Sequence, residues 1–208
     1  MAEVGPVAVS GAVEGLLDEA VLRRLVEDVG ATASSVYGKT GKQRLLQRLN
    51  GYNNAAQRGP WFVLVDLNGD DDCAPPFREK WLPTPAPYMC FRIAVREVEA
   101  WLFADPKRLA PFLGVRASAL PNDPELVVEP KRTMVQVAAI SRRRAIREDM
   151  VPRPASGRQV GPAYTARLIE FVTDPATGWR PSVAARESDS LERCLRCLRS
   201  LVEKAAPS

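Results

Sequence analysis

The sequence predicts an α/β fold, in which helices cover both faces of a mainly parallel sheet. Short apolar segments alternate with amphipathic helical segments through the first hundred residues. The most apolar segment, residues 61–65, is an unbroken run of five residues that favour strands. Such a run is typical of a strand that is buried on both faces, as in a parallel sheet between two layers of helices.

The first strand is predicted at residues 7–13, which are small and apolar and lie between Gly-Pro and Gly. Apolar residues then recur at three- and four-residue spacing over 18–29, which predicts an amphipathic helix that ends at Gly30. Further segments continue the alternation. They are a strand at 34–37, a helix over 45–52, strands at 61–65 and 88–95, and a helix over 97–104.

The second half of the chain is richer in proline and predicts mainly helices, near 131–146, 162–173 and 189–204. Asp189 and Glu192 can form a capping box at the start of the last helix. We therefore predict an α/β core over 1–115 and a helical extension over 116–208. The extension is expected to pack on the core, so that the two form one compact domain.

The chain of 208 residues contains no histidine, and this absence restricts its chemistry. Mechanisms that use an imidazole base or histidine-bound zinc are excluded. An enzyme of this composition needs a carboxylate, a lysine or a metal-bound water as its base. The net charge of +4 is too small to establish nucleic-acid binding by itself.

The sequence also carries information about the compartment. No run of eighteen apolar residues is present, which excludes a membrane span, and the first residues do not resemble a signal peptide. The four cysteines form no metal-ligand pattern, and Cys194 and Cys197 are expected to fill the core of the last helix. We expect a cytoplasmic protein with reduced cysteines.

Acidic residues follow two of the predicted strands. Glu14 comes after the first strand and Asp66 after the third, with Asn68 and Asp70 close behind. Functional groups collect at the carboxyl ends of parallel strands, and hard oxygen ligands suit Mg²⁺ or Mn²⁺. The alternative is a solvated acidic turn, because Asn-Gly-Asp also favours turns.

These acids belong to a longer pattern that resembles a known family. Glu14 after the first strand and Asp66-Leu67-Asn68 after the third resemble the TOPRIM pattern of topoisomerases, primases and OLD-type nucleases. The motifs at 38–42, 66–70 and 97–105, and more weakly those at 129–131 and 161–164, resemble the TOPRIM-like DUF4276 family. The resemblance spans most of the chain.

The resemblance implies a TOPRIM-like, Rossmann-like fold and a magnesium site at Glu14, Asp66, Asn68 and Asp70. It also implies nuclease activity, possible roles in defence and a partner ATPase of the AAA or ABC type. One residue departs from the TOPRIM pattern, because Asn68 replaces the second aspartate of the Asp-x-Asp pair. An amide oxygen brings no charge, which puts catalytic competence in doubt.

Further candidates complete the predicted site. Glu99 is the candidate for a third catalytic acid, although an acid here can also simply stabilise a helix N-terminus. Lys131 and Arg96 could offset charge on a phosphoryl oxygen. The alternative for Lys131 is a solvated position at a helix start.

Basic residues supply the candidate nucleic-acid contacts. The turn at 38–42 lacks the first glycine of a P-loop, so ATP binding is excluded there, but Lys39 and Lys42 could contact a phosphate backbone. Arg142, Arg143, Arg144 and Arg158 form part of the main basic concentration, which could equally be a solvated surface.

The leading hypothesis is a Mg²⁺- or Mn²⁺-dependent nuclease, with DNA favoured over RNA as the substrate. Two alternatives stay open: a non-catalytic subunit that binds nucleic acid or regulates an ATPase, and an enzyme that hydrolyses or transfers phosphate on nucleotides.

Overall fold

The computed structural model describes residues 5–68 and 74–206. Its centre is a parallel sheet of four strands in the order β2-β1-β3-β4. The strands are β1 (Ala8–Val13), β2 (Thr32–Gly38), β3 (Trp61–Asp66) and β4 (Met89–Ala94). The predicted α/β class with a parallel sheet is therefore confirmed.

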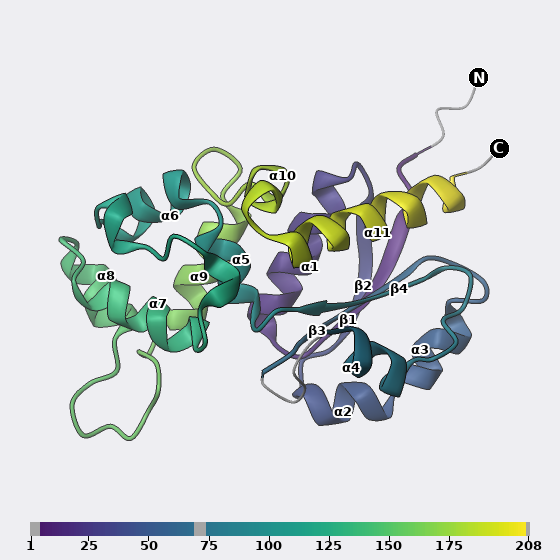
Figure 1. Cartoon of the computed structure of the whole chain (residues 1–208), viewed down its shortest axis with the longest axis horizontal. Coiled ribbons are helices and arrows are strands. Elements are labelled where there is room, and N and C mark those ends of the chain that lie inside the picture. The colour runs from purple at the N-terminus through teal and green to yellow at the C-terminus, as the bar shows by residue number, and fades with distance from the viewer. Residues whose placement is uncertain (1–4, 69–73, 207–208) are drawn as a thin grey trace.

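The sheet has helices on both faces (Figure 1). Helices α1 (Leu16–Asp28) and α11 (Asp189–Ala205) cover one face. The other face carries α2 (Lys42–Gln47), α3 (Leu49–Ala55) and α4 (Ala74–Trp81). Strand β3 shows why both layers form: Phe62 and Leu64 belong to one buried cluster, whereas Val63 and Val65 belong to the other. Successive side chains of a strand point to opposite faces, so an all-apolar strand needs cover on both.

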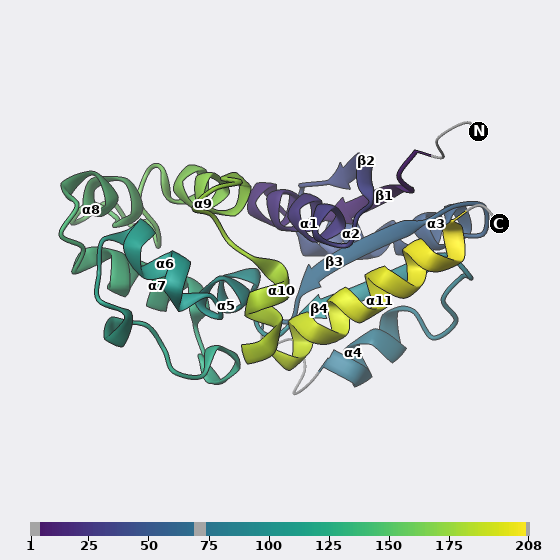
Figure 2. The same cartoon turned by 90° about the horizontal axis from the view of Figure 1, so that it is seen from above.

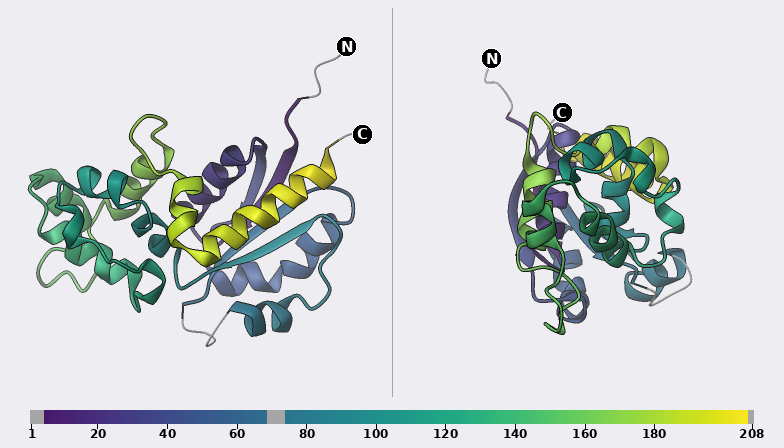
Figure 3. Two further views of the ribbon diagram at one scale, coloured as in Figure 1. Left: turned by 45° about the horizontal axis from the view of Figure 1, so that its top comes forward. Right: turned by 90° about the vertical axis from the view of Figure 1, so that its left-hand side faces the viewer.

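Most of the remaining helices lie beyond the carboxyl ends of the strands (Figure 3). They are α5 (Val98–Phe103), α6 (Pro106–Leu113), α7 (Pro130–Ala139), α8 (Arg144–Met150), α9 (Tyr164–Thr173) and α10 (Pro181–Ala184), with short 3₁₀ turns between them. Helix α11 then returns along the sheet beside β4 (Figure 2). Residue 115 thus lies within the helical part, and one continuous buried cluster contains side chains from the sheet, α1 and the helical part.

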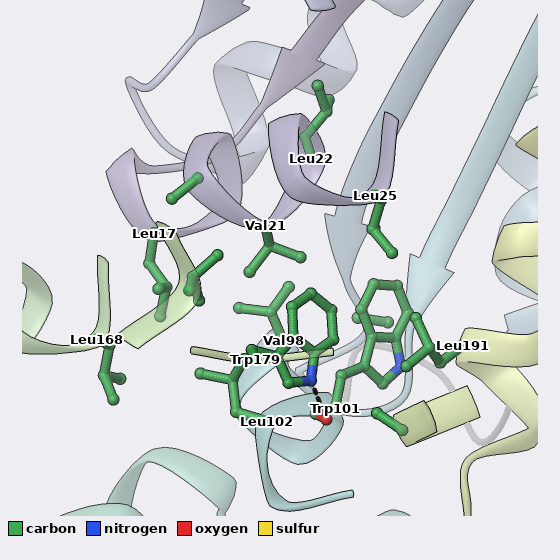
Figure 4. Close-up of a cluster of buried hydrophobic side chains, with 14 of the residues drawn as sticks. Leu17, Val21, Leu22, Leu25, Val98, Trp101, Leu102, Leu168, Trp179 and Leu191 are labelled. Atoms are coloured by element: carbon green, nitrogen blue, oxygen red, sulfur yellow. Dashed lines mark hydrogen bonds between the residues drawn. The ribbon is translucent and has the colours of Figure 1, made fainter. Parts of the chain in front are cut away.

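Two buried tryptophans join the helical part to the sheet layer (Figure 4). Trp101 of α5 and Trp179 before α10 are both 0% exposed, and they pack among leucines and valines of α1. Trp179 Nε1 donates to the carbonyl of Trp101 at 3.2 Å, and Trp101 Nε1 donates to Ser190 Oγ at 2.8 Å. Buried indoles require such acceptors, and these bonds fix how the layers meet. Trp101 is a core residue.

Several predicted helix boundaries were wrong for local reasons. The helix expected over 131–146 stops at Ala139, and α8 starts at Arg144. Between them Ser141 Oγ accepts a bond from the amide of Arg143 at 2.9 Å and donates to the Leu113 carbonyl, which holds the chain in a turn. The last helix is capped by Ser188, whose side chain accepts from the amide of Leu191, and not by Asp189.

The segment predicted as one helix over 45–52 forms α2 and α3, which meet at Arg48. Helix α1 ends as predicted beside Gly30, whose φ of +77° is left-handed. In the described part of the chain, no helix combines the length and apolar character needed to cross a membrane.

The cysteine prediction is correct in one part and wrong in another. Cys194 is a buried free thiol of the core. Cys197 forms a disulfide with Cys90 of β4, 107 residues away along the chain. A separation of this size gives no sequence signal, because only the return of α11 to the sheet brings the two residues together.

Candidate acidic site at the carboxyl edge of the sheet

Glu14 and Asp66 meet at the carboxyl edge of the sheet, as predicted. Glu14 directly follows β1 and Asp66 is the last residue of the neighbouring strand β3. Glu14 Oε1 accepts a hydrogen bond from the Asp66 amide at 2.7 Å. The Asp66 carboxylate in turn accepts a bond from the amide of Val98, the first residue of α5, at 3.0 Å. These bonds connect β1, β3 and α5.

Asp66 lies in a field of negative charge. Its side chain is buried, and burial raises its pKa well above the ordinary value for an aspartate. The charges of Asp18, Glu99, Glu14 and Glu97 raise the pKa further, in that order. Five carboxyl groups therefore interact around one point at the edge of the sheet.

Asp18 is a member of this group that was not among the predicted site residues. It is 8% exposed in the first turn of α1, and burial raises its pKa, while Lys131 opposes that shift. Its position four residues after Glu14 was the available signal, because a short strand-to-helix turn returns such a residue to the same edge of the sheet.

Lys131 provides positive charge inside this group of acids. The amide of Lys131 donates to Glu97 Oε2 at 2.8 Å, and its Nζ lies 3.3 Å from Glu97 Oε1 and 3.8 Å from Glu99 Oε1. Burial acts to lower the pKa of Lys131, but the charges of Glu99 and Glu97 outweigh burial and raise it. The ammonium group therefore stays charged and holds both glutamates.

Glu99 is buried behind Lys131. It is 1% exposed, and burial raises its pKa to about 7 against the opposing effect of Lys131. Tyr164 Oη donates to Glu99 Oε1 at 3.1 Å. Glu99 therefore contacts Lys131 and Tyr164 rather than the solvent, and it can influence chemistry only through them.

A polar cavity of about 620 Å³ opens beside the acids. Its walls include Arg96, Glu97 and Lys131 from the site itself. The remaining lining residues are Asn68, Val128, Glu129, Arg132 and Gln159. Of the two glutamates at the start of α5, Glu97 lines the cavity and Glu99 does not. A volume of this size accommodates a nucleotide-sized group.

Asn68 follows the end of β3 by two residues and lies at the cavity. Asn68 adopts a left-handed backbone conformation with φ of +51°, which asparagine tolerates. Its backbone amide donates a hydrogen bond to the carbonyl of Arg96 at 3.0 Å. Its side chain is exposed and carries no charge. Asp70 lies outside the described residues.

The donor set suits a hard divalent cation. Its oxygens belong to buried and half-buried carboxylates that repel one another, and a cation between them would relieve that repulsion. Among residues 5–68 and 74–206, however, no three His, Cys, Asp or Glu side chains are already arranged to hold a metal. The residues fit a metal in chemistry and charge, and a complete ligand set requires side-chain movement or a further ligand.

The lysines of the 38–42 turn contact protein groups. Lys39 Nζ lies 2.8 Å from Glu19 Oε2 and donates to the Val36 carbonyl at 3.0 Å. Lys42 Nζ donates to the carbonyls of Asp66 and Leu67 and so supports the end of β3. Lys42 therefore lies at the acidic site, beside the end of β3.

Four of the predicted arginines are not among the residues that line the cavity beside the acids: Arg142, Arg143, Arg144 and Arg158. Arg142, Arg143 and Arg144 follow α7, whose ten residues extend about 15 Å away from Lys131. Arg144 pairs with Glu148 at 2.7 Å, and Arg143 Nη1 donates to the Phe112 carbonyl at 3.2 Å. Arg158 is exposed and precedes Gln159 of the cavity wall. Only Arg96 of the predicted arginines lines the cavity itself.

Comparison of the chain with protein-family models, curated proteins and solved structures finds no match. The resemblance to the TOPRIM-like DUF4276 family therefore stays a prediction.

Proposed function

We propose that this protein is a divalent-metal-dependent hydrolase of phosphodiester bonds in nucleic acid, with DNA as the preferred substrate. The observation that carries the proposal is the convergence of Glu14, Asp66 and neighbouring carboxyl groups on one buried point beside a cavity lined by Arg96 and Lys131. Acids that repel one another next to basic groups are typical of metal-dependent phosphate chemistry.

The ligands of the proposed Mg²⁺ or Mn²⁺ ion are Glu14 and Asp66, with Asn68 and Asp70 as further candidates. A bound divalent ion polarises a phosphoryl oxygen and lowers the pKa of water. The electrostatics support a bound cation, since burial and the charges of four neighbouring carboxyl groups raise the pKa of Asp66, while Lys131 forms its ion pairs with Glu97 and Glu99. The absence of histidine leaves these oxygens as the available ligands.

The chain's own groups have separate roles in this proposal. Arg96 and Lys131 bind oxygens of the phosphodiester in the cavity, because both line it and carry positive charge. Glu97 faces the same cavity and can accept a proton from water on its carboxylate. Glu99 and Tyr164 are positioning residues, since they hold Lys131 from behind.

A nuclease assay tests the proposal directly. The purified chain is incubated with labelled DNA and RNA in the presence of Mg²⁺, Mn²⁺ or EDTA. Cleavage is expected only with metal, and Glu14→Gln and Asp66→Asn are expected to reduce it by at least about a hundredfold. Glu27→Gln is the matched control, because it removes a carboxylate from α1 whose side chain is 62% exposed. Cleavage that persists in both site variants would overturn this assignment.

Two other functions remain as competing proposals. The cavity of about 620 Å³ also fits a free nucleotide, which favours a nucleotide phosphohydrolase or phosphotransferase. The uncharged Asn68 favours a non-catalytic subunit that binds nucleic acid or regulates an ATPase. Nucleoside triphosphates are included in the same assay, and their hydrolysis supports the phosphohydrolase or phosphotransferase. DNA binding without cleavage, alone and with an ATPase partner, supports the second.

A further inference from the structure

A second cavity, of about 560 Å³, lies at the outer edge of the sheet. It is bordered by the edge strand β4 and by the helices α4 and α11, which flank that strand on opposite faces (Figure 2). Part of its wall is apolar and includes Ala74, Pro75 and Val95. None of its lining residues borders the acidic site's cavity.

Four arginines from three elements line this second cavity. Arg92 comes from the middle of β4, Arg78 from α4, and Arg193 and Arg196 from α11. These residues are separated by up to 118 positions in sequence, so no local charge run indicates the cluster. Only the packing of α4 and α11 around β4 brings the four guanidinium groups together.

The positive charge of the cluster is only partly balanced. Arg193 pairs with Asp189 at 2.8 Å and Arg196 pairs with Glu192 at 3.2 Å. Within the described residues, Arg78 and Arg92 form no ion pair. Glu125 also lines the cavity, but its Oε1 accepts bonds from Ser188 Oγ and the Ser190 amide at the start of α11.

Arg92 is the most constrained member. Its Nε is buried and has no hydrogen-bond acceptor in the described structure. Burial lowers the pKa of Arg92, and the charges of Arg78, Arg193 and Arg196 lower it further, while Cys194 opposes them. A half-buried guanidinium beside three like charges is unfavourable without an anion. An anion in the cavity would offset this repulsion.

We propose that the second cavity binds a small phosphorylated molecule of nucleotide size, with its phosphate against Arg92, Arg78 and the two α11 arginines. Arg78 and Arg92 form no ion pair with any residue of 5–68 or 74–206, and a phosphomonoester carries about −1.5 to −2 charges at pH 7, which matches their charge. The planar guanidinium fork suits phosphate oxygens. The apolar wall accommodates the uncharged part of the ligand, and the volume lies in the range of small-molecule sites.

Isothermal titration calorimetry on the full chain tests this proposal, with adenosine monophosphate, adenosine, inorganic phosphate and a DNA oligonucleotide as separate probes. Adenosine monophosphate is expected to bind, adenosine is expected not to bind, and inorganic phosphate is expected to bind more weakly. Arg78→Gln and Arg196→Gln are each expected to weaken binding about tenfold, since each removes a charged contact. Both side chains are exposed, so both variants should fold.

Arg199→Gln is the matched control, because it removes the same charge from α11 at a residue that does not line the cavity. Its affinity for adenosine monophosphate should equal that of the unmodified protein. Asp66→Asn should also bind normally, which separates this site from the proposed catalytic one. The proposal is overturned if adenosine monophosphate fails to bind. It is also overturned if Arg199→Gln weakens the binding of adenosine monophosphate as much as Arg196→Gln does, or if the cavity variants change the binding of the oligonucleotide alone.

Discussion

Glu14 accepts a hydrogen bond from the backbone amide of Asp66 at 2.7 Å, although 52 positions separate the two residues in sequence. The bond directs one carboxylate oxygen of Glu14 toward the end of β3. The Asp66 side chain is at the same time held by the Val98 amide. Backbone amides therefore orient both carboxylates.

Asp66→Asn should increase the stability of the isolated protein at pH 8. The amide oxygen can still accept the bond from Val98, whereas the charge that four neighbouring carboxylates repel is removed. We expect a gain of about 1 kcal/mol in the free energy of unfolding, measured by urea denaturation in EDTA. Glu27→Gln, at an exposed position of α1, should change stability by less than about 0.5 kcal/mol. A loss of stability in Asp66→Asn would contradict the charge argument.

Glu99 should make the protein less stable as the pH rises from about 4.5 to 7. Its folded pKa of about 7 exceeds the ordinary value of 4.5, so folding takes up a proton in that window. Above pH 7 the ionised group costs about 3 kcal/mol, which then stays constant. Glu99→Gln should flatten the dependence, measured by urea denaturation between pH 4.5 and 8. An unchanged slope would show that Glu99 has an ordinary pKa.

Divalent cations should stabilise the protein more at pH 8 than at pH 5. The pKa values of Asp66 and Asp18 are raised, so protonation competes with metal binding at low pH. At a Mg²⁺ concentration a hundredfold above its dissociation constant, the gain at pH 8 should be about 2.7 kcal/mol. Thermal melts in Mg²⁺ and in EDTA measure it. Asp66→Asn should lose most of this gain, and an equal gain in both proteins would place the metal elsewhere.

Gly38→Ala should destabilise the protein by at least about 2 kcal/mol. Gly38 ends β2 with φ of +90°, and an added Cβ would lie 2.2 Å from the carbonyl oxygen of Val13, the residue before Glu14. Gly51→Ala is the matched control, because Gly51 lies in α3 with nothing within 4 Å of an added Cβ. That change should stabilise by about 0.5–1 kcal/mol. Similar free energies of unfolding for the two variants would contradict the steric argument.

The sequence alone determined the fold class and the positions of Glu14 and Asp66 at the edge of the sheet. The apolar run in β3 is typical of a strand covered on both faces, and the alternation of such segments with amphipathic helices predicted the parallel sheet. Glu14 and Asp66 followed from the same prediction, because the carboxyl ends of parallel strands share one edge. These features depend on local patterns of hydrophobicity, which a sequence displays directly.

Only the tertiary structure decided the rest. Glu97 faces the cavity and Glu99 is buried because α5 packs its inner face against α1 and α9. The motif in the sequence contains both glutamates and does not show which of them is exposed. The arginines around the second cavity and the Cys90–Cys197 disulfide depend on the return of α11 to β4. Contacts between segments a hundred residues apart are set by how whole elements pack, and no local pattern in the sequence encodes them.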